Sequence, residues 1–143
     1  MSNYQHILVG LDLSEESRQV IDRVKKLFDL DNVKLSLIHV QEPMSFAYGG
    51  DIPMDLGEIQ SQMEERAQQS LKSIGKELKV SEDNQHVIIG QPAAEMHRFA
   101  KEQDVDLIVV GTHGRHGFSL VLGSTANGVL HGCVCDVLAV RIK

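Results

Sequence analysis

A glycine-rich segment near the end of the sequence has the composition of an anion-binding loop. It begins at Gly111, continues through Gly114 and Gly123, and ends in the hydroxyl pair Ser124 and Thr125. Glycine lets a backbone approach a bulky anion closely and adopt a positive φ, where other side chains would clash. A helix that begins at Ser124 would add unpaired amides and the positive end of its dipole. The segment therefore predicts a phosphate-binding loop.

Side chains in this loop could strengthen its hold on a phosphate. Ser124 and Thr125 could donate hydroxyl hydrogens, and Arg115 could add positive charge. His113 lies near the proposed phosphates and is a predicted contact. His113 and His116 could also assist hydrolysis, but for that role we interpret them as solvated loop residues, and we predict no catalytic residue and at most a weak ATPase. Two histidines three positions apart, without a carboxylate nearby, predict no metal site. The simpler alternative is a glycine-rich turn in which Ser124 caps its own helix.

The elements that must position this loop alternate along the chain. Short apolar runs predict strands, and stretches with apolar residues at helical spacing predict helices between them. The expected strands are residues 7–11, 33–40, 87–89, 107–110 and 137–140. The first expected helix follows Ser14, which can cap it, and the second spans 59–78, with Met63 on its apolar stripe. The third begins at Pro92, and the fourth spans 124–131. Such alternation predicts one α/β domain over residues 1–143, with a parallel sheet of five strands, right-handed crossovers and helices on both faces.

In open parallel sheets, ligands bind beyond the carboxyl ends of the strands, where the strand order reverses. The residues at those ends are Leu11 and Asp12 after the first strand, Val40 in the second, and Val110 and Gly111 in the fourth. Asp12 could accept hydrogen bonds from ribose hydroxyls, and the backbone of Val40 could meet an adenine edge. Alternatively, Asp12 is a capping or turn residue.

Composition and charge exclude several other classes. The net charge is −6 and no basic face is apparent, which disfavours direct binding of DNA or RNA. No apolar run approaches the ~20 residues of a membrane span, and the N-terminus lacks a signal-peptide pattern, so we expect a cytoplasmic protein. Cys133 and Cys135 have neither the C-x-x-C redox spacing nor a zinc-site set, and we expect free thiols that are packed or face opposite sides.

Other ligand-binding proteins with this architecture match the sequence poorly. A P-loop needs G-x4-G-K-[ST], which does not occur here. A phosphoacceptor receiver needs an acidic pair after its first strand, where this chain has the single residue Asp12. A flavodoxin needs aromatic side chains to stack on flavin, but the chain has no Trp and only Tyr48 in a candidate loop.

Several segments together resemble the universal stress protein family. They are HILVGLDLS at 6–14, LIHV at 37–40, VDLIVVGTHG at 105–114, and GST at 123–125 ahead of the terminal VLAV strand. The resemblance covers essentially the whole chain. It implies a Rossmann-like fold of the adenine nucleotide alpha-hydrolase type with strand order 3-2-1-4-5. It also implies a homodimer formed by pairing of the C-terminal fifth strands, and a cytoplasmic role in stress tolerance.

The nucleotide-binding branch of that family carries G-x2-G-x9-G-[ST] and binds ATP or AMP, with the phosphates on the loop. The resemblance maps the motif onto Gly111, Gly114, Gly123 and Ser124, with Asp12 at the ribose. Two features depart from that branch. Eight residues rather than nine separate Gly114 from Gly123, and residues 45–57 resemble a branch that does not bind ATP.

We predict binding of ATP or AMP, with or without Mg²⁺, and slow hydrolysis or none, because the glycine loop would contact phosphate directly. The alternative function is a nucleotide-free homodimeric interaction module that acts through partner proteins. In that case residues 41–57, a long connection that contains two prolines, would form the contact surface.

Overall fold

The structure is a computed structural model that describes residues 4–43, 56–112 and 124–143. Strands and helices alternate as the sequence predicts. The elements are β1 (His6–Gly10), α1 (Ser17–Leu27), β2 (Lys34–Gln41), α2 (Leu56–Leu78), a 3-10 turn η1 (Glu82–Asn84), β3 (Gln85–Ile89), α3 (Pro92–Glu102), β4 (Leu107–Gly111), α4 (Ser124–Leu130) and β5 (Asp136–Val140). Each predicted strand is present, with its ends within two residues of the predicted ones.

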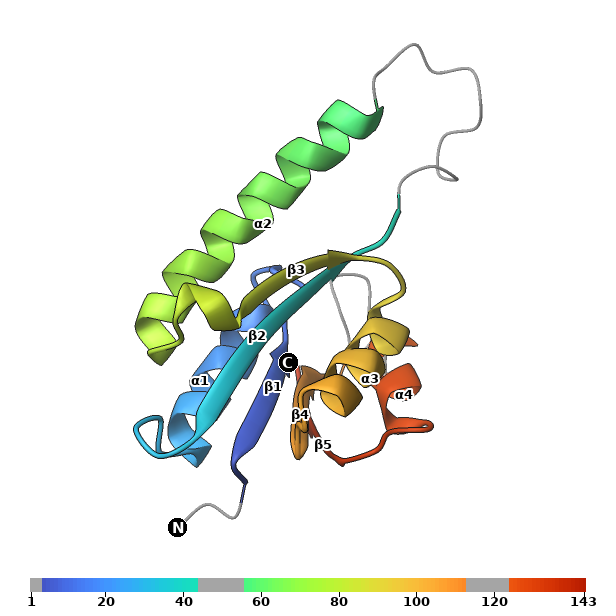
Figure 1. The fold of residues 1–143 in the computed structure, drawn as a ribbon. Coiled ribbons are helices and arrows are strands. Elements are labelled where there is room, and N and C mark those ends of the chain that lie inside the picture. Colours follow the sequence, from blue (N-terminus) through green and yellow to red (C-terminus); the bar gives the residue numbers. More distant parts are fainter. Residues whose placement is uncertain (1–3, 44–55, 113–123) are drawn as a thin grey trace.

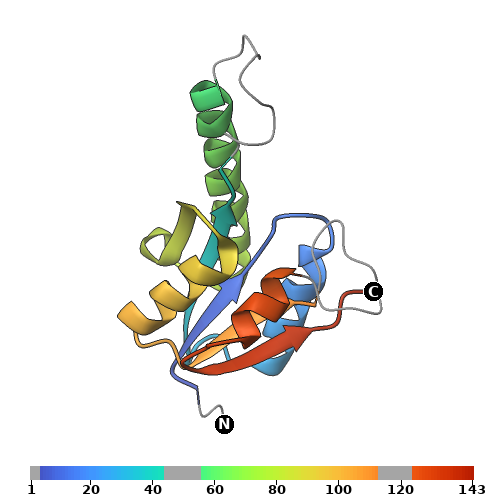
Figure 2. The ribbon, with the colours of Figure 1, turned by 90° about the vertical axis from the view of Figure 1, so that its right-hand side faces the viewer.

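The five strands form one sheet in the order β3-β2-β1-β4-β5, and every neighbouring pair is parallel (Figure 1). This confirms the predicted sheet and its order. Helices α1 and α2 cover one face, and α3 and α4 cover the other (Figures 1 and 2). The N-terminal end of α2 extends beyond the sheet, so that Met63, predicted to lie on its buried stripe, is 41% exposed.

The central strand β1 explains why the strands appear as continuous apolar runs. Its side chains alternate between the two faces, so that Ile7 and Val9 pack toward α1 and α2, whereas Leu8 packs toward α3 and α4. All three are fully buried. A strand covered on both faces needs apolar residues at every position, which removes the alternating pattern of a half-exposed strand.

The start of α1 differs from the prediction. Ser14 does not cap the helix: its hydroxyl donates to Asp12 Oδ1 at 2.7 Å, and α1 begins only at Ser17. The amide of Ser17 donates to the Ser14 carbonyl at 3.1 Å, which inserts a turn before the helix. The competing local bond to Asp12 therefore removes the predicted cap.

The start of α3 agrees with the prediction. Pro92 occupies the first turn, where its missing amide hydrogen costs nothing. The side chain of Gln91 accepts a hydrogen bond from the Ala94 amide at 2.7 Å and so acts as the cap.

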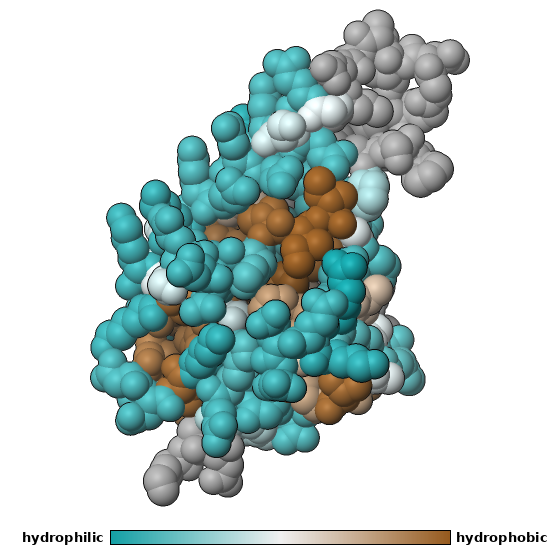
Figure 3. Space-filling view, in the orientation of Figure 1, coloured by the Kyte–Doolittle hydropathy of each residue, from teal (hydrophilic) through white to brown (hydrophobic). Residues whose placement is uncertain are grey.

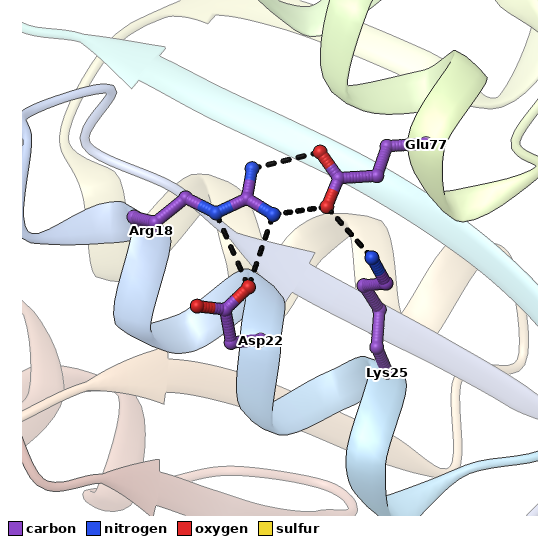
Figure 4. A network of polar contacts seen from close by, with 4 residues as sticks. All are labelled: Arg18, Asp22, Lys25 and Glu77. Atoms are coloured by element: carbon purple, nitrogen blue, oxygen red, sulfur yellow. Dashed lines mark hydrogen bonds and ion pairs between the residues drawn. The ribbon is translucent and has the colours of Figure 1, made fainter.

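An ion-pair network joins α1 to α2 on the surface (Figure 4). The Glu77 carboxylate of α2 accepts hydrogen bonds from both terminal nitrogens of Arg18, one of them at 2.7 Å, and from Lys25 Nζ at 3.0 Å. Arg18 also bonds Asp22 one turn along α1. The hydrogen bonds from Arg18 and then Lys25 lower the pKa of Glu77 from 4.5 to about 2.

Glu77→Gln should lower the free energy of unfolding at pH 7 by about 0.5–1 kcal/mol, because solvent screens this exposed network. A carboxylate with a depressed folded pKa stabilises above its unfolded pKa, and that contribution is lost as pH falls from about 4.5 toward 2. The difference between variant and wild type in urea unfolding should therefore shrink between pH 6 and pH 3. Glu65→Gln, on the exposed side of α2, is the matched control. An equal loss in both variants would contradict the assignment.

Candidate functional site

The strand order reverses between β1 and β4, because the chain runs from β1 outward to β2 and β3 and then returns to the other side of β1. The carboxyl ends of these two strands lead into Asp12 and Thr112 respectively. This is the edge of the sheet at which open α/β folds bind ligands. Five of the predicted site residues lie at or next to this edge: Leu11, Asp12, Val40, Val110 and Gly111.

Asp12 sits in a tight turn after β1. Its Oδ1 accepts hydrogen bonds from the Ser14 amide at 3.0 Å and from the Ser14 hydroxyl at 2.7 Å. Within the described ranges, Oδ2 has no such partner. The next residue, Leu13, has φ +61°, a left-handed conformation that is costly for leucine and is often found beside functional sites. Asp12 is thus a turn residue whose Oδ1 is hydrogen-bonded to Ser14 and whose Oδ2, among the described residues, has no hydrogen-bond partner.

The end of β2 leaves a main-chain donor and acceptor unpaired. Leu11 N donates to the Ile38 carbonyl at 3.0 Å, so Ile38 faces β1, and Val40, two residues further, faces the same side. Gly10 and Ile38 are the last register pair between the strands. Among the described residues, the amide and carbonyl of Val40 have no main-chain partner, although its side chain is only 8% exposed.

His39 explains why Val40 stays unpaired. One more step of the parallel ladder would use the Leu11 carbonyl as the acceptor for the Val40 amide. Instead, that carbonyl lies 2.8 Å from His39 Nδ1. Because a carbonyl can only accept, Nδ1 carries the hydrogen and donates. The imidazole therefore donates to the carbonyl toward which the next step of the β1–β2 pairing would be directed.

The end of β4 is fixed by the chain segment after β5. The Thr112 amide donates to the Val140 carbonyl at 2.8 Å, and the Ile142 amide donates to Thr112 Oγ1 at 3.0 Å. A Cβ on Gly111 would lie 3.1 Å from the Ile142 side chain, so packing already favours glycine there. Val110, just before it, is buried against α3 and α4. The first residues of the predicted loop thus have a structural role of their own.

The other end of the predicted loop is the start of α4. This helix begins at Ser124, as predicted, and Thr125 is half-buried in its first turn. It packs closely on α3, since a Cβ on Gly128 would lie 2.8 Å from Ala93 Cβ. His97 of α3 donates from Nε2 to the Val129 carbonyl at 2.8 Å. The remaining predicted site residues, His113, Gly114, Arg115 and Gly123, lie outside the described residues.

The sequence pattern does not identify two residues at this edge, His39 and Thr112. The position of His39, one residue before a predicted adenine contact, was the available signal. No cluster of three metal-ligating side chains occurs among the residues that the structure describes.

A groove lies elsewhere, between α2 and β3. It has a volume of about 430 Å³ and contains none of the predicted site residues. Its lining is mostly long polar side chains, such as Gln68, Lys72 and Gln85. The same face of the molecule is largely hydrophilic, with an apolar strip beside α2 and β3 (Figure 3), and Ile89 at the end of β3 is 38% exposed. We assign no ligand to this groove, because none of the predicted site residues within the described ranges lines it, and those residues lie instead at the carboxyl ends of β1, β2 and β4 and at the start of α4.

The model of the universal stress protein family matches residues 3–141 of this chain. Universal stress protein A homolog 2 of Coxiella burnetii is 43% identical over 145 residues, which cover all of this chain and 99% of the relative.

Solved structures agree with the sheet and its order. The hypothetical protein MJ0577 superposes with a TM-score of 0.82 at 26% identity, over 99% of both chains. A universal stress protein crystallised in complex with cAMP superposes with a TM-score of 0.64 at 24% identity, over 97% of this chain and 98% of that one.

Within the described ranges, no helix combines the length and the apolar content that crossing a bilayer would require. The family match, the identity to a curated relative and the shared fold lead to one conclusion. This chain belongs to the universal stress protein family.

Proposed function

We propose that this protein binds an adenine nucleotide, ATP or AMP with or without Mg²⁺, at the carboxyl ends of β1, β2 and β4, and hydrolyses it slowly or not at all. The observation that carries the proposal concerns the described residues, among which the amide and carbonyl of Val40 have no main-chain partner and Asp12 Oδ2 has no hydrogen-bond partner. Their position at the strand-order reversal supports a ligand there. The family member crystallised with cAMP, which is itself an adenine nucleotide, also supports it.

Each part of a nucleotide has a chemical counterpart at this edge. Adenine presents a donor, its exocyclic amine, next to a ring-nitrogen acceptor, and an adjacent backbone carbonyl and amide complement that pair. We assign this role to Val40, with Leu11 and Val110 flanking the base and ribose. Asp12 Oδ2 would accept from a ribose hydroxyl. The phosphates would lie against Gly111, His113, Gly114, Arg115 and Gly123, and against Ser124 and Thr125 at the start of α4.

The assembly that we propose is a homodimer through β5, in the cytoplasm, with a role in stress tolerance. Within the described part of the chain, β5 is an edge strand whose only neighbour is β4. An unpaired strand edge offers main-chain donors and acceptors to a second copy. Light scattering coupled to size exclusion would measure the mass of the particle directly.

Unfolding measured with and without nucleotide tests the binding proposal. ATP or AMP at about 100 times its dissociation constant should stabilise the folded state by ~2.7 kcal/mol. GTP carries the same phosphates on a different base, so a much smaller shift with GTP would support base recognition through Val40. If millimolar ATP, ADP and AMP all leave the unfolding curve unchanged, the protein is instead the nucleotide-free interaction module.

A further inference from the structure

Two thiols face each other in the connection between α4 and β5. Sγ of Cys133 and Sγ of Cys135 are 3.7 Å apart, and both side chains are half-buried. Both pack against the core cluster that β1, β2 and β4 form with α3 and α4. The expectation of packed thiols is therefore confirmed, and the alternative that they face opposite sides is wrong. Val134, between them, is 61% exposed.

The geometry lies close to that of a bonded pair. A disulfide requires the two sulfurs at about 2.05 Å, so they must approach by less than 2 Å. Residues 131–135, between α4 and β5, form neither helix nor strand, and Gly132 among them has φ +76° with no atom within 4 Å of an added Cβ. A connection without regular structure, with open space beside Gly132, is expected to adjust by that amount more easily than a strand or a helix.

We propose that Cys133 and Cys135 are an oxidation-sensitive pair that forms a reversible intramolecular disulfide when the protein meets a hydroperoxide. The site is separate from the proposed nucleotide site, because neither cysteine is among the residues assigned there. Its ligand class is a small peroxide that can reach two half-buried thiols at the surface.

The reaction balances with peroxide as the oxidant. The thiolate of one cysteine attacks one peroxide oxygen, so that an S–O bond forms, the O–O bond breaks, and the leaving hydroxide takes up a proton to become water. Sγ of the other cysteine then attacks the sulfenic sulfur, the S–S bond forms, and hydroxide leaves with the thiol proton as a second water. Two thiols and one hydrogen peroxide yield one disulfide and two waters.

Burial and the neighbouring Cys133 raise the pKa of the Cys135 thiol. The geometry does not depend on which thiol reacts first, because the two sulfurs are 3.7 Å apart and either one can resolve the sulfenic acid of the other.

Peptide mapping of the full chain tests the proposal. Trypsin cleaves after Arg115 and Arg141, so residues 116–141 form one peptide that contains both cysteines. Folded protein treated with stoichiometric hydrogen peroxide and then N-ethylmaleimide should give this peptide about 2 Da lighter and without maleimide, since two hydrogens are lost. Dithiothreitol before alkylation should restore two maleimide adducts. Circular dichroism before and after treatment verifies that the protein stays folded.

Matched variants test whether the lighter peptide requires the two thiols themselves or only the loop that carries them. Cys133→Ser and Cys135→Ser should each abolish the lighter peptide, whereas Val134→Ser, which changes the same loop but keeps both thiols, should form it as the wild type does. Two maleimide adducts after peroxide treatment would overturn the proposal. Conversion to sulfinic acids alone, or a cross-link between two copies of the 116–141 peptide, would overturn it as well.

Discussion

Replacing Asp12 with alanine should weaken ATP binding by about 10- to 150-fold while the chain remains folded. A hydrogen bond to a charged group contributes about 1.5–3 kcal/mol, which corresponds to that range of affinity. Alanine also removes the acceptor of the two Ser14 bonds, which loosens the turn after β1. The sheet should persist, because Val9 and the rest of β1 keep their packing on both faces. Titration calorimetry with ATP measures the change.

Two further variants make the Asp12 result specific. Asp12→Asn keeps an oxygen for Ser14 but loses the negative charge, so its affinity should fall between those of wild type and Asp12→Ala. Asp83→Asn makes the same charge change in the exposed η1 turn and should bind ATP as the wild type does. If Asp12→Ala bound ATP as tightly as the wild type, Asp12 would not be the residue that contacts the ribose.

Replacing Gly128 with valine should lower the free energy of unfolding by about 1–3 kcal/mol, the usual cost of forcing atoms into a packed interior. The Cβ would lie 2.8 Å from Ala93 Cβ, an atom that cannot move away without its helix. A helical glycine normally costs roughly 0.5–1 kcal/mol relative to alanine, so its presence in α4 indicates that close contact with α3 outweighs helix propensity. Because α4 begins at Ser124, its displacement should also weaken nucleotide binding.

A double-mutant cycle tests the contact between α3 and α4. Ala93→Gly removes the opposing Cβ, so it should recover part of the stability that Gly128→Val loses, and the two changes should not be additive. Asn127→Ala, on the exposed side of the same helix, should change stability by no more than about 0.5 kcal/mol. Urea unfolding gives the stabilities of the wild type, the two single variants, the double variant and the Asn127→Ala control. A Gly128→Val protein as stable as the wild type would show that the helices do not depend on this close approach.

The sheet was predictable because burial on both faces leaves a strong signal. Runs such as Ile7 to Leu11 and Leu107 to Val110 are apolar at every position, and the helical spacing between the runs leaves a parallel sheet as the simplest arrangement. The strand order came from the family resemblance. The cap predicted at Ser14 is wrong because its hydroxyl can bond either the first amides of the helix or the Asp12 carboxylate. The sequence pattern does not show which of the two bonds forms.

The site was predictable in its position but not in its details. Strand ends can be found in the sequence, so Asp12, Val40 and Gly111 could be named in advance. The diversion of the Leu11 carbonyl to His39 could not, because it depends on where a side chain of one strand meets the end of another. For the same reason, the sequence does not predict the hydrogen bond from the Ile142 amide to Thr112 Oγ1 or the facing thiols of Cys133 and Cys135.

The central place of β1 has a consequence for how the protein is made. A ribosome releases β1 early, but its second neighbour, β4, begins only at Leu107. Until then the nascent chain carries a strand that is buried along its whole length in the folded protein, with one edge open, a state prone to wrong pairing. Contacts between such distant segments also form slowly. Translation that stalls before Leu107 would therefore yield a fragment that needs chaperones to stay out of aggregates.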